Sequence, residues 1–465
     1  MQEPILFSNL IAETKDGEWG EGQEAPGHVL CDVIRGTDFA DLHAPAIVLP
    51  QRWIPEHLVA RKALQADDIL IETAGGTAKQ STGRTALITK ELLDSRGGKP
   101  VLCSSFARHL RVDKDKAHPV YLYYVLQALY ASGYMGVFNL QHTGVARFQF
   151  TAFRTKTRLT LHQKAAQPKI AATLKSYDDL IANNKRRIAL LESMAEEIYR
   201  EWFVRMRFPG VGGKPSSNGV PAGWASKPLR SLILHYIGGG WGEEQATTTC
   251  PDGAFVFRGT DLPAIQGGDW TDFVYRFHKT SALASRTLAA GDFVFEVSGG
   301  STNQLLGRNL MVSAQLLEHL DEPAICASFC KLIRFDQAVV APLWMKYFLK
   351  MYYDSGLVGL YQVQSTGISN YQFEAFIANQ TVLVPDTDLQ AEFCKLVEPL
   401  NEQRDSLARA NLHLTRTRDA LLPRLISGKL RVGQLNIQFP PSMQDEKQPP
   451  AEVAPARAEA VTMNR

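Results

Sequence analysis

Apolar residues recur at a regular spacing between residues 168 and 207. Steps of four and three residues in turn, from Ile170 to Trp202, meet an apolar side chain at every position except Asn184. This period is typical of a long helix packed against another long helix. At ~1.5 Å rise per residue it would span roughly 50–55 Å, longer than an ordinary core helix. The seam that we expect includes Ile170, Leu174, Tyr177, Ile181, Asn184, Ile188, Leu191, Ile198 and Trp202.

An internal repeat organises the rest of the chain. The tripeptide Trp-Gly-Glu and the tetrapeptide Arg-Gly-Thr-Asp each occur twice, and one stretch of 17 residues aligns on another without a gap. The offset between matched residues stays between 222 and 224, so the chain is a tandem duplication. The matched segments are 19–21 with 241–243, 35–38 with 258–261, 68–84 with 292–308, 103–106 with 326–329, and 141–144 with 364–367.

The repeat predicts a second long helix. Adding 223 to the first seam gives mostly apolar positions, with Asn411 among the polar ones. Two self-complementary units can bury a shared seam by two-fold pairing, whereas a solenoid needs at least about three repeats. We therefore expect the two helices to run antiparallel with pseudo-two-fold symmetry, and Asn184 and Asn411 to fix their register. The second seam comprises Phe393, Val397, Leu400, Leu407, Asn411, Leu414, Leu421 and Leu425.

Each repeat also predicts a globular module of mixed structure. Short β-type runs, such as residues 69–73 and 293–297, alternate with Gly-rich turns and are followed by a helical run. This mixture predicts an α+β fold with two tandem α/β modules. The expected organisation is a module at 1–165, a central helix at 166–207, a Gly/Pro/Ser-rich linker at 208–224, a second module at 225–388, a C-terminal helix at 389–430 and a disordered tail at 431–465.

Composition narrows the class of protein. The net charge is only +2, so binding to nucleic acid would depend on local arrangement rather than on an overall basic field. The 6 cysteines show neither Cys-x-x-Cys nor Cys/His ligand spacing, which suits buried thiols in a reducing compartment. No secretory signal is visible at the N-terminus, and no stretch approaches the ~20 apolar residues of a membrane helix. We expect a soluble, cytoplasmic chain.

Familiar catalytic motifs are absent or broken. Residues 73–85 resemble a phosphate-binding loop but lack its Gly-Lys-Ser/Thr ending, and Pro215 interrupts a similar run at 210–217. The sequence has no His-Glu-x-x-His, no Gly-x-Ser-x-Gly and no Asn-Pro-Pro-aromatic tetrapeptide. His142 has Ser365 as its counterpart, which favours a loop histidine. We therefore expect no catalytic residue, bound cofactor or metal site in this chain.

A duplicated module on a long helical spacer suggests a protein that reads two DNA half-sites, since B-DNA repeats about every 34–36 Å. Features that both repeats share should be scaffold, and residues that differ are better candidates for reading bases. For Arg84 and Arg308, which both repeats share, contact with phosphate and internal pairing stay open as alternatives. Candidate donors in the poorly matched stretches, for which solvated surface charge is the alternative, are Arg52, His57, Arg61, Lys62, Arg276, His278 and Lys279.

The sequence as a whole resembles that of the specificity subunit of type I restriction-modification systems. The segments 190–210 and 417–430 are similar to the ends of the two helical regions of that family, and 364–369 followed by 382–385 resembles the close of its target recognition domains. The resemblance covers residues 1 to about 430. The first repeat departs from it, with Gly144-Val145-Ala146 in place of Gly-Ile-Ser and no Pro after residues 159–161.

The resemblance implies two target recognition domains that read a bipartite, asymmetric DNA sequence across a gap set by the antiparallel helices. It implies two methylation subunits, which would carry S-adenosylmethionine and the adenine-methylating site. It also implies restriction subunits that would use ATP and Mg²⁺ for translocation and cleavage. In that case this chain would supply specificity and its partners the chemistry.

Two other classes of function stay open. The chain could be a coiled-coil scaffold or adaptor whose duplicated modules bind protein, or a self-contained nuclease or methylase. A DNA reader should lose affinity steeply between 50 and 200 mM salt as counterions are released, and a protein adaptor need not. Methyl transfer to DNA by the purified chain alone would support the self-contained enzyme.

Overall fold

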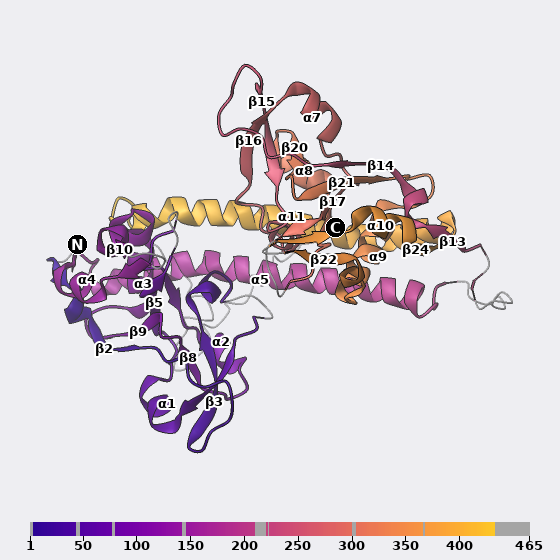
Figure 1. Ribbon diagram of the computed structural model, residues 1–465. Helices are drawn as coiled ribbons and strands as arrows, with labels where there is room; N and C mark the ends of the chain where they lie inside the picture. Colours follow the sequence, from indigo (N-terminus) through magenta and orange to yellow (C-terminus); the bar gives the residue numbers. More distant parts are fainter. Residues whose placement is uncertain are drawn as a thin grey trace, which may run out of the picture. The chain divides into compact units, whose positions relative to one another are not determined.

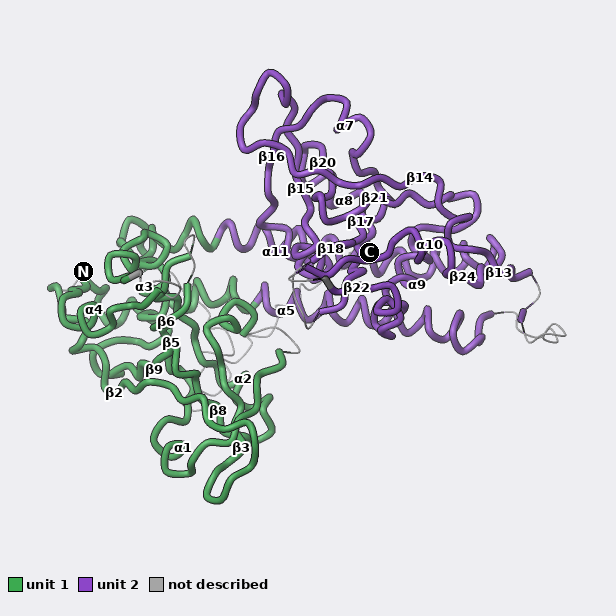
Figure 2. The backbone as a smooth tube through the Cα atoms, in the orientation of Figure 1, with its two compact units in different colours: residues 1–179, 418–465 green, residues 180–417 purple. Residues whose placement is uncertain are grey.

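The chain divides into two compact units. The computed structural model describes residues 3–42, 47–76, 80–141, 146–209, 220–221, 223–299, 304–365 and 368–432 (Figure 1). Unit 1 consists of residues 1–179 and 418–465, and unit 2 of residues 180–417 (Figure 2). Most of the predicted linker, His142 and the predicted tail from residue 433 onward lie outside the described residues.

The described residues of unit 1 form four small sheets with short helices between them. Its sheets have the strand orders β2-β9-β5-β7, β4-β3-β8, β10-β11-β6 and β1-β12. Only β3 and β8 pair in parallel among these strands. The elements are β1 Ile5–Leu6, β2 Ile11–Asp16, β3 His28–Ile34, β4 Gln51–Pro55, α1 Glu56–Lys62, β5 Ile69–Glu72, β6 Ala74–Gly75, β7 Thr85–Leu87, α2 Lys90–Asp94, β8 Val101–Cys103, β9 Ala107–Val112, α3 Pro119–Ala131, β10 Asn139–Gln141, β11 Ala146–Phe148, α4 Phe150–Lys156 and β12 Arg158–Leu159.

Unit 2 repeats this topology. Its sheets have the orders β14-β21-β17-β19, β16-β15-β20, β18-β23-β22 and β13-β24, and β15 pairs with β20 in parallel as β3 does with β8. The predicted α+β duplication is confirmed. The elements are β13 Ala225–Pro228, β14 Ile233–Gly238, β15 Asp252–Phe257, α6 Leu262–Gln266, β16 Val274–His278, α7 Thr280–Arg286, β17 Phe293–Glu296, β18 Ser298–Gly299, β19 Asn309–Met311, α8 Ala314–Leu320, β20 Ala324–Cys326, β21 Cys330–Phe335, α9 Pro342–Asp354, β22 Gln362–Ser365, β23 Ile368–Tyr371, α10 Phe373–Asn379 and β24 Thr381–Val384.

Two long helices follow the modules. Helix α5 spans Gln167–Tyr199 and continues into a π-helical segment at Arg200–Val204, and α11 spans Thr387–Ile426. Each has a buried glutamine in its first turn: the Oε1 atom of Gln167 accepts the backbone N–H of His118 at 2.8 Å, and that of Gln390 accepts Ala341 N–H at 2.8 Å. Because these bonds satisfy orphan donors at the starts of α3 and α9, they fix where each long helix leaves its module.

Each unit contains the start of its own repeat's long helix and the end of the other's. In unit 1, Leu422 and Leu425 near the C-terminal end of α11 complete the core around α3 and the start of α5. In unit 2, Tyr199 and Phe203 from the end of the first helical region pack with Phe393 of α11. This reciprocal composition is what two-fold pairing requires.

The two long helices run antiparallel within each unit. Arg418 Nη1 lies 2.6 Å from Asp178 Oδ1 in unit 1, and in unit 2 Asn184 contacts Asn411 while Glu192 faces Arg404. Residue numbers therefore rise along α5 as they fall along α11, which confirms the predicted direction. None of the predicted seam residues is exposed: Ile170, Leu174, Asn184, Ile188, Phe393, Val397, Leu407, Asn411 and Leu425 are buried, and Tyr177, Ile181, Leu191, Ile198, Trp202, Leu400, Leu414 and Leu421 are half-buried.

The buried face of α5 departs from the strict heptad near its end. Tyr199 and Phe203 are buried, whereas the predicted positions Ile198 and Trp202 are only half-buried. A straight α-helix drifts by ~20° per heptad relative to a 3.5-residue repeat. Over four heptads this drift amounts to roughly 80°, close to the 100° between neighbouring residues, so the buried position moves on by one.

Candidate nucleic-acid interface

A buried ion pair recurs in both repeats at the end of the 17-residue match. Arg84 contacts Glu72 through Nε at 2.9 Å and Nη2 at 2.7 Å, and Arg308 Nε lies 2.8 Å from Glu296. Both carboxylates are 2% exposed. The hydrogen bond to the carboxylate raises the pKa of each arginine. The structure thus shows that Arg84 pairs with Glu72 and Arg308 with Glu296. Contact of either arginine with phosphate stays a prediction.

The repeated Arg-Gly-Thr-Asp motif has a scaffolding role. The Asp38 carboxylate accepts both the backbone N–H and the guanidinium of Arg35, and Asp261 does the same for Arg258. The glycine after each arginine lies against the buried ion pair. A Cβ at Gly36 would come within 2.6 Å of Glu72 Oε1 and one at Gly259 within 2.6 Å of Glu296 Oε1, so a side chain at either position would have to displace the paired carboxylate.

The repeated Trp-Gly-Glu motif carries a stacked arginine in each repeat. The Arg52 guanidinium lies 4.4 Å from the ring centroid of Trp19, and that of Arg276 lies 5.1 Å from Trp241. These arginines occupy equivalent strand positions: Arg52 pairs with Cys31 across β3–β4, and Arg276 with Ala254 across β15–β16. Arg52 and Arg276 lie in stretches where the sequences of the two repeats match poorly. The tryptophan that both repeats share was the signal that could have identified them as equivalent residues.

The other candidate donors of the first module lie on α1. His57 and Arg61 are exposed. Lys62 instead forms an ion pair with Glu18, with Nζ 2.8 Å from Oε2, and its side chain is 18% exposed. Lys279, just before α7 in the second module, is exposed. Arg61, His57 and Lys279 are therefore accessible to a ligand, whereas Lys62 already has a carboxylate partner.

His278, a predicted DNA-binding residue, is buried in this structure, and its contact with DNA stays a prediction. Its side chain is 4% exposed, and a Cβ at Gly242 would lie 2.5 Å from its Cε1 atom. Burial, followed by repulsion from Arg286, lowers the pKa of the imidazole. Its structural counterpart in the first repeat is Ile54, which is fully buried. A histidine at this inward-facing strand position therefore belongs to the core.

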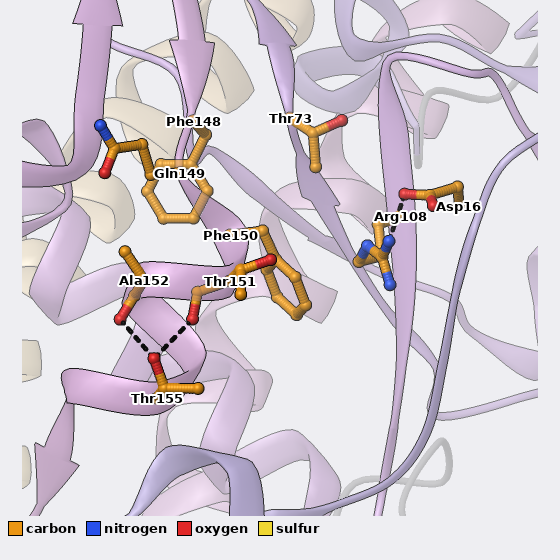
Figure 3. A pocket seen from close by; sticks show the side chains of 9 residues that line it. All are labelled: Asp16, Thr73, Arg108, Phe148, Gln149, Phe150, Thr151, Ala152 and Thr155. Carbon is orange, nitrogen blue, oxygen red and sulfur yellow. Dashed lines mark hydrogen bonds and ion pairs between the residues drawn. The ribbon is translucent and has the colours of Figure 1, made fainter.

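Unit 1 has an open depression of about 580 Å³, and Figure 3 shows the side chains that line it. Arg108 points to Asp16 and lies 4.7 Å from the centroid of the Phe150 ring. Lys331 lies 5.0 Å from Phe373 at the equivalent position of unit 2. The residues that line the depression are Asp16, Thr73, Arg108, Phe148, Gln149, Phe150, Thr151, Ala152 and Thr155.

The helix region of unit 2 holds a buried polar cluster. Lys346 Nζ lies 2.9 Å from Glu192 Oε2 and 2.6 Å from Asn401 Oδ1, and Arg404 Nη1 lies 3.5 Å from the same carboxylate oxygen. Burial alone would raise the pKa of Glu192, but the charges of Lys346 and Arg404 outweigh it and lower that pKa. The cluster ties α9 to both long helices within the unit.

Within the described ranges, no group of three or more His, Cys, Asp or Glu side chains is placed to hold a metal ion. No helix in the described part of the chain is long and apolar enough to cross a membrane.

Comparison with known proteins adds a relative that matches along most of the chain. No protein-family model matches it. The chain is 23% identical over 401 residues to the "Type I restriction enzyme MjaIX specificity subunit" of Methanocaldococcus jannaschii, an alignment that covers 82% of this chain and 83% of the relative. Because neither repeat alone makes up so large a share, the alignment extends into both.

Solved structures give the same kind of match at low similarity. The S subunit of a type I restriction-modification system from M. genitalium is 13% identical, with a TM-score of 0.48 and coverage of 91% of this chain and 95% of that one. The HsdS subunit from Thermoanaerobacter tengcongensis is 14% identical, with a TM-score of 0.32 and coverage of 92% and 97%. The resemblance to a type I restriction enzyme specificity subunit, which the sequence predicts, is confirmed by the aligned relative.

Proposed function

We propose that this chain is the sequence-specific DNA-binding specificity subunit of a type I restriction-modification complex. The observation that carries the proposal is the alignment of 401 residues with a type I specificity subunit, which extends into both repeats. The comparison does not favour a protein-binding scaffold. The role of the chain itself is non-catalytic.

The duplicated architecture supports reading a bipartite target. Each unit has a module with the same topology but different exposed side chains, so each can recognise a different base sequence. The antiparallel helices α5 and α11 run on from one unit into the other. In the proposed function their length sets the gap between the two half-sites.

Partner subunits supply the chemistry in this proposal. Two methylation subunits bring S-adenosylmethionine and methylate adenine in each half of the target. Restriction subunits bring the ATP- and Mg²⁺-dependent activities. The residues of this chain hold the modules and bind the DNA.

A methylome tests the proposal directly. Adenine methylation is mapped in DNA from host cells with the chain, without it, and with residues 225–388 replaced by the second module of another specificity subunit. The expected result is one split motif that disappears on deletion and changes in one half only on replacement. An unchanged set of modified adenines in the deletion strain would refute the proposed function.

A further inference from the structure

The stacked arginines of the two repeats differ in one neighbouring charge. Arg52 and Arg276 both lie over a tryptophan, and each has a buried Nε with no hydrogen-bond partner in the described structure. Stacking therefore holds each guanidinium in place, and its Nη atoms are the donors left for another group. Arg276 uses them within the chain: Nη2 lies 3.2 Å from Glu244 Oε1, and Nη1 donates to the Tyr275 carbonyl at 3.3 Å.

The first repeat lacks this acidic partner. Glycine at position 22 stands where Glu244 stands in the second repeat, because Trp19-Gly20-Glu21-Gly22 aligns on Trp241-Gly242-Glu243-Glu244. A Cβ at Gly22 would lie 3.1 Å from Arg52 Nη1, so this position is directly beside the guanidinium. Among the described residues, the Arg52 guanidinium has no ion pair or hydrogen bond.

We propose that Arg52, stacked on Trp19, binds a phosphate of the DNA backbone, and that Glu244 withholds Arg276 from the equivalent contact. The inference rests on the proposed function, because it assumes that the modules bind DNA. A guanidinium with free Nη donors matches phosphate oxygens, and its stacking on tryptophan limits the conformational entropy lost on binding. Beside Arg276 the Glu244 carboxylate takes the donor and repels phosphate. The two modules thus bind the DNA backbone unequally.

A reciprocal exchange tests this asymmetry. Full-length chain, assembled in its host complex, is titrated with duplex DNA carrying its mapped target over 50 to 200 mM salt. Arg52→Ala removes the cation, Gly22→Glu installs the missing carboxylate, and Glu244→Gly removes it from the second repeat. The Cβ of Gly22→Glu meets only the flexible end of Arg52, so this variant decides the question if Arg52→Ala fails to fold.

Each phosphate contact contributes about 0.9 to the slope of log affinity against log salt, so losing one makes the affinity loss over this range about 3.5-fold smaller. We expect that reduction in Arg52→Ala and Gly22→Glu, the opposite change in Glu244→Gly, and the wild-type slope in Arg52→Lys. The charge-matched control Arg276→Gln/Glu244→Gln should keep the wild-type slope.

The outcomes separate the two proposals. A wild-type slope in both Arg52→Ala and Gly22→Glu would overturn the Arg52 contact while leaving DNA binding intact. An unchanged slope in Glu244→Gly would overturn the role of Glu244. A wild-type complex without salt-dependent DNA binding would instead refute the proposed function itself.

Discussion

Asn184 donates a hydrogen bond from Nδ2 to Oδ1 of Asn411 at 2.9 Å, between the two long helices within unit 2. The pair is buried, at 8% and 5% exposure. An offset of 223 assigns Leu407 to Asn184 and Ile188 to Asn411, and those two residues belong to the same apolar core. The asparagine pair therefore corresponds, through the internal repeat, to an apolar pair of leucine and isoleucine. Only one register of the two helices brings the two asparagines together, so the pair specifies that register.

A double-mutant cycle tests the asparagine pair. Asn184→Leu alone leaves the Asn411 amide without its partner and should destabilise the protein by about 1–3 kcal/mol. Asn184→Leu/Asn411→Leu should recover much of that loss, because both polar groups are then gone. Denaturant unfolding measures each free energy. Strictly additive effects would show that the two side chains are not coupled.

Substitution of a buried seam residue should unfold unit 2, and substitution of an exposed neighbour should not. Ile188 is 2% exposed and Leu190 is 64% exposed on the same helix. Because Ile188→Asp buries an unpaired carboxylate, we expect a loss of more than about 4 kcal/mol, together with loss of methylation by the complex. Leu190→Asp should change the unfolding free energy by no more than about 0.5 kcal/mol. Equal midpoints of unfolding for the two variants would contradict the burial of the seam.

The buried ion pair offers a test of the two readings of Arg84. Arg84→Met leaves the buried Glu72 carboxylate uncompensated and should cost about 3–5 kcal/mol. Glu72→Gln/Arg84→Met should lose less, because no charge is then buried alone. Thermal and denaturant unfolding provide the comparison. Unchanged stability in Arg84→Met, combined with a smaller salt slope in DNA binding, would favour contact with phosphate instead.

The Glu192 cluster predicts an acid-sensitive contribution to stability. The charges of Lys346 and Arg404 outweigh burial and hold the pKa of Glu192 below its ordinary value of 4.5. A carboxylate whose pKa is lower in the folded state stabilises it at pH above 4.5, and this contribution is lost as pH falls through the folded pKa. Glu192→Gln should therefore be less stable than the wild type near neutral pH, and the gap should close on acidification. Unfolding free energies measured from pH 7 to pH 3 check this sign.

Insertions into α5 test whether the helix sets the gap between half-sites. Four residues inserted after Leu180 would lengthen the helix by roughly 6 Å and turn its seam by about 40°. Seven residues, a full heptad, would add roughly 10 Å and keep the seam in phase. We expect the heptad insertion to retain methylation at a target with a longer gap and the four-residue insertion to lose activity. An active insertion variant with the original gap would rule out the spacing role.

The sequence predicts the long helices because the heptad period lies within one stretch of chain, and it predicts the duplication because matched residues recur at an offset of 222 to 224. The burial of Tyr199 in place of Ile198 was missed because a heptad template ignores the drift of a straight helix. The inward position of His278 depends on which strand residues face its sheet. That placement follows from pairing with a distant strand, so local pattern could not reveal it. For the same reason the sequence did not link Trp19 and Arg52, which lie beside the antiparallel bridge between Glu21 and Trp53.

The core of unit 1 includes Leu422, Leu425 and Val432 from the far end of the chain. His162 also contacts the carbonyl oxygens of Leu425 and Ile426, at 2.9 and 3.1 Å. A ribosome makes these residues only after the whole second module, so the first module emerges early but waits for the second repeat before its apolar surface is covered. Premature termination anywhere in the second repeat would therefore damage both halves of the protein, and a truncated product would expose a ready target for proteases.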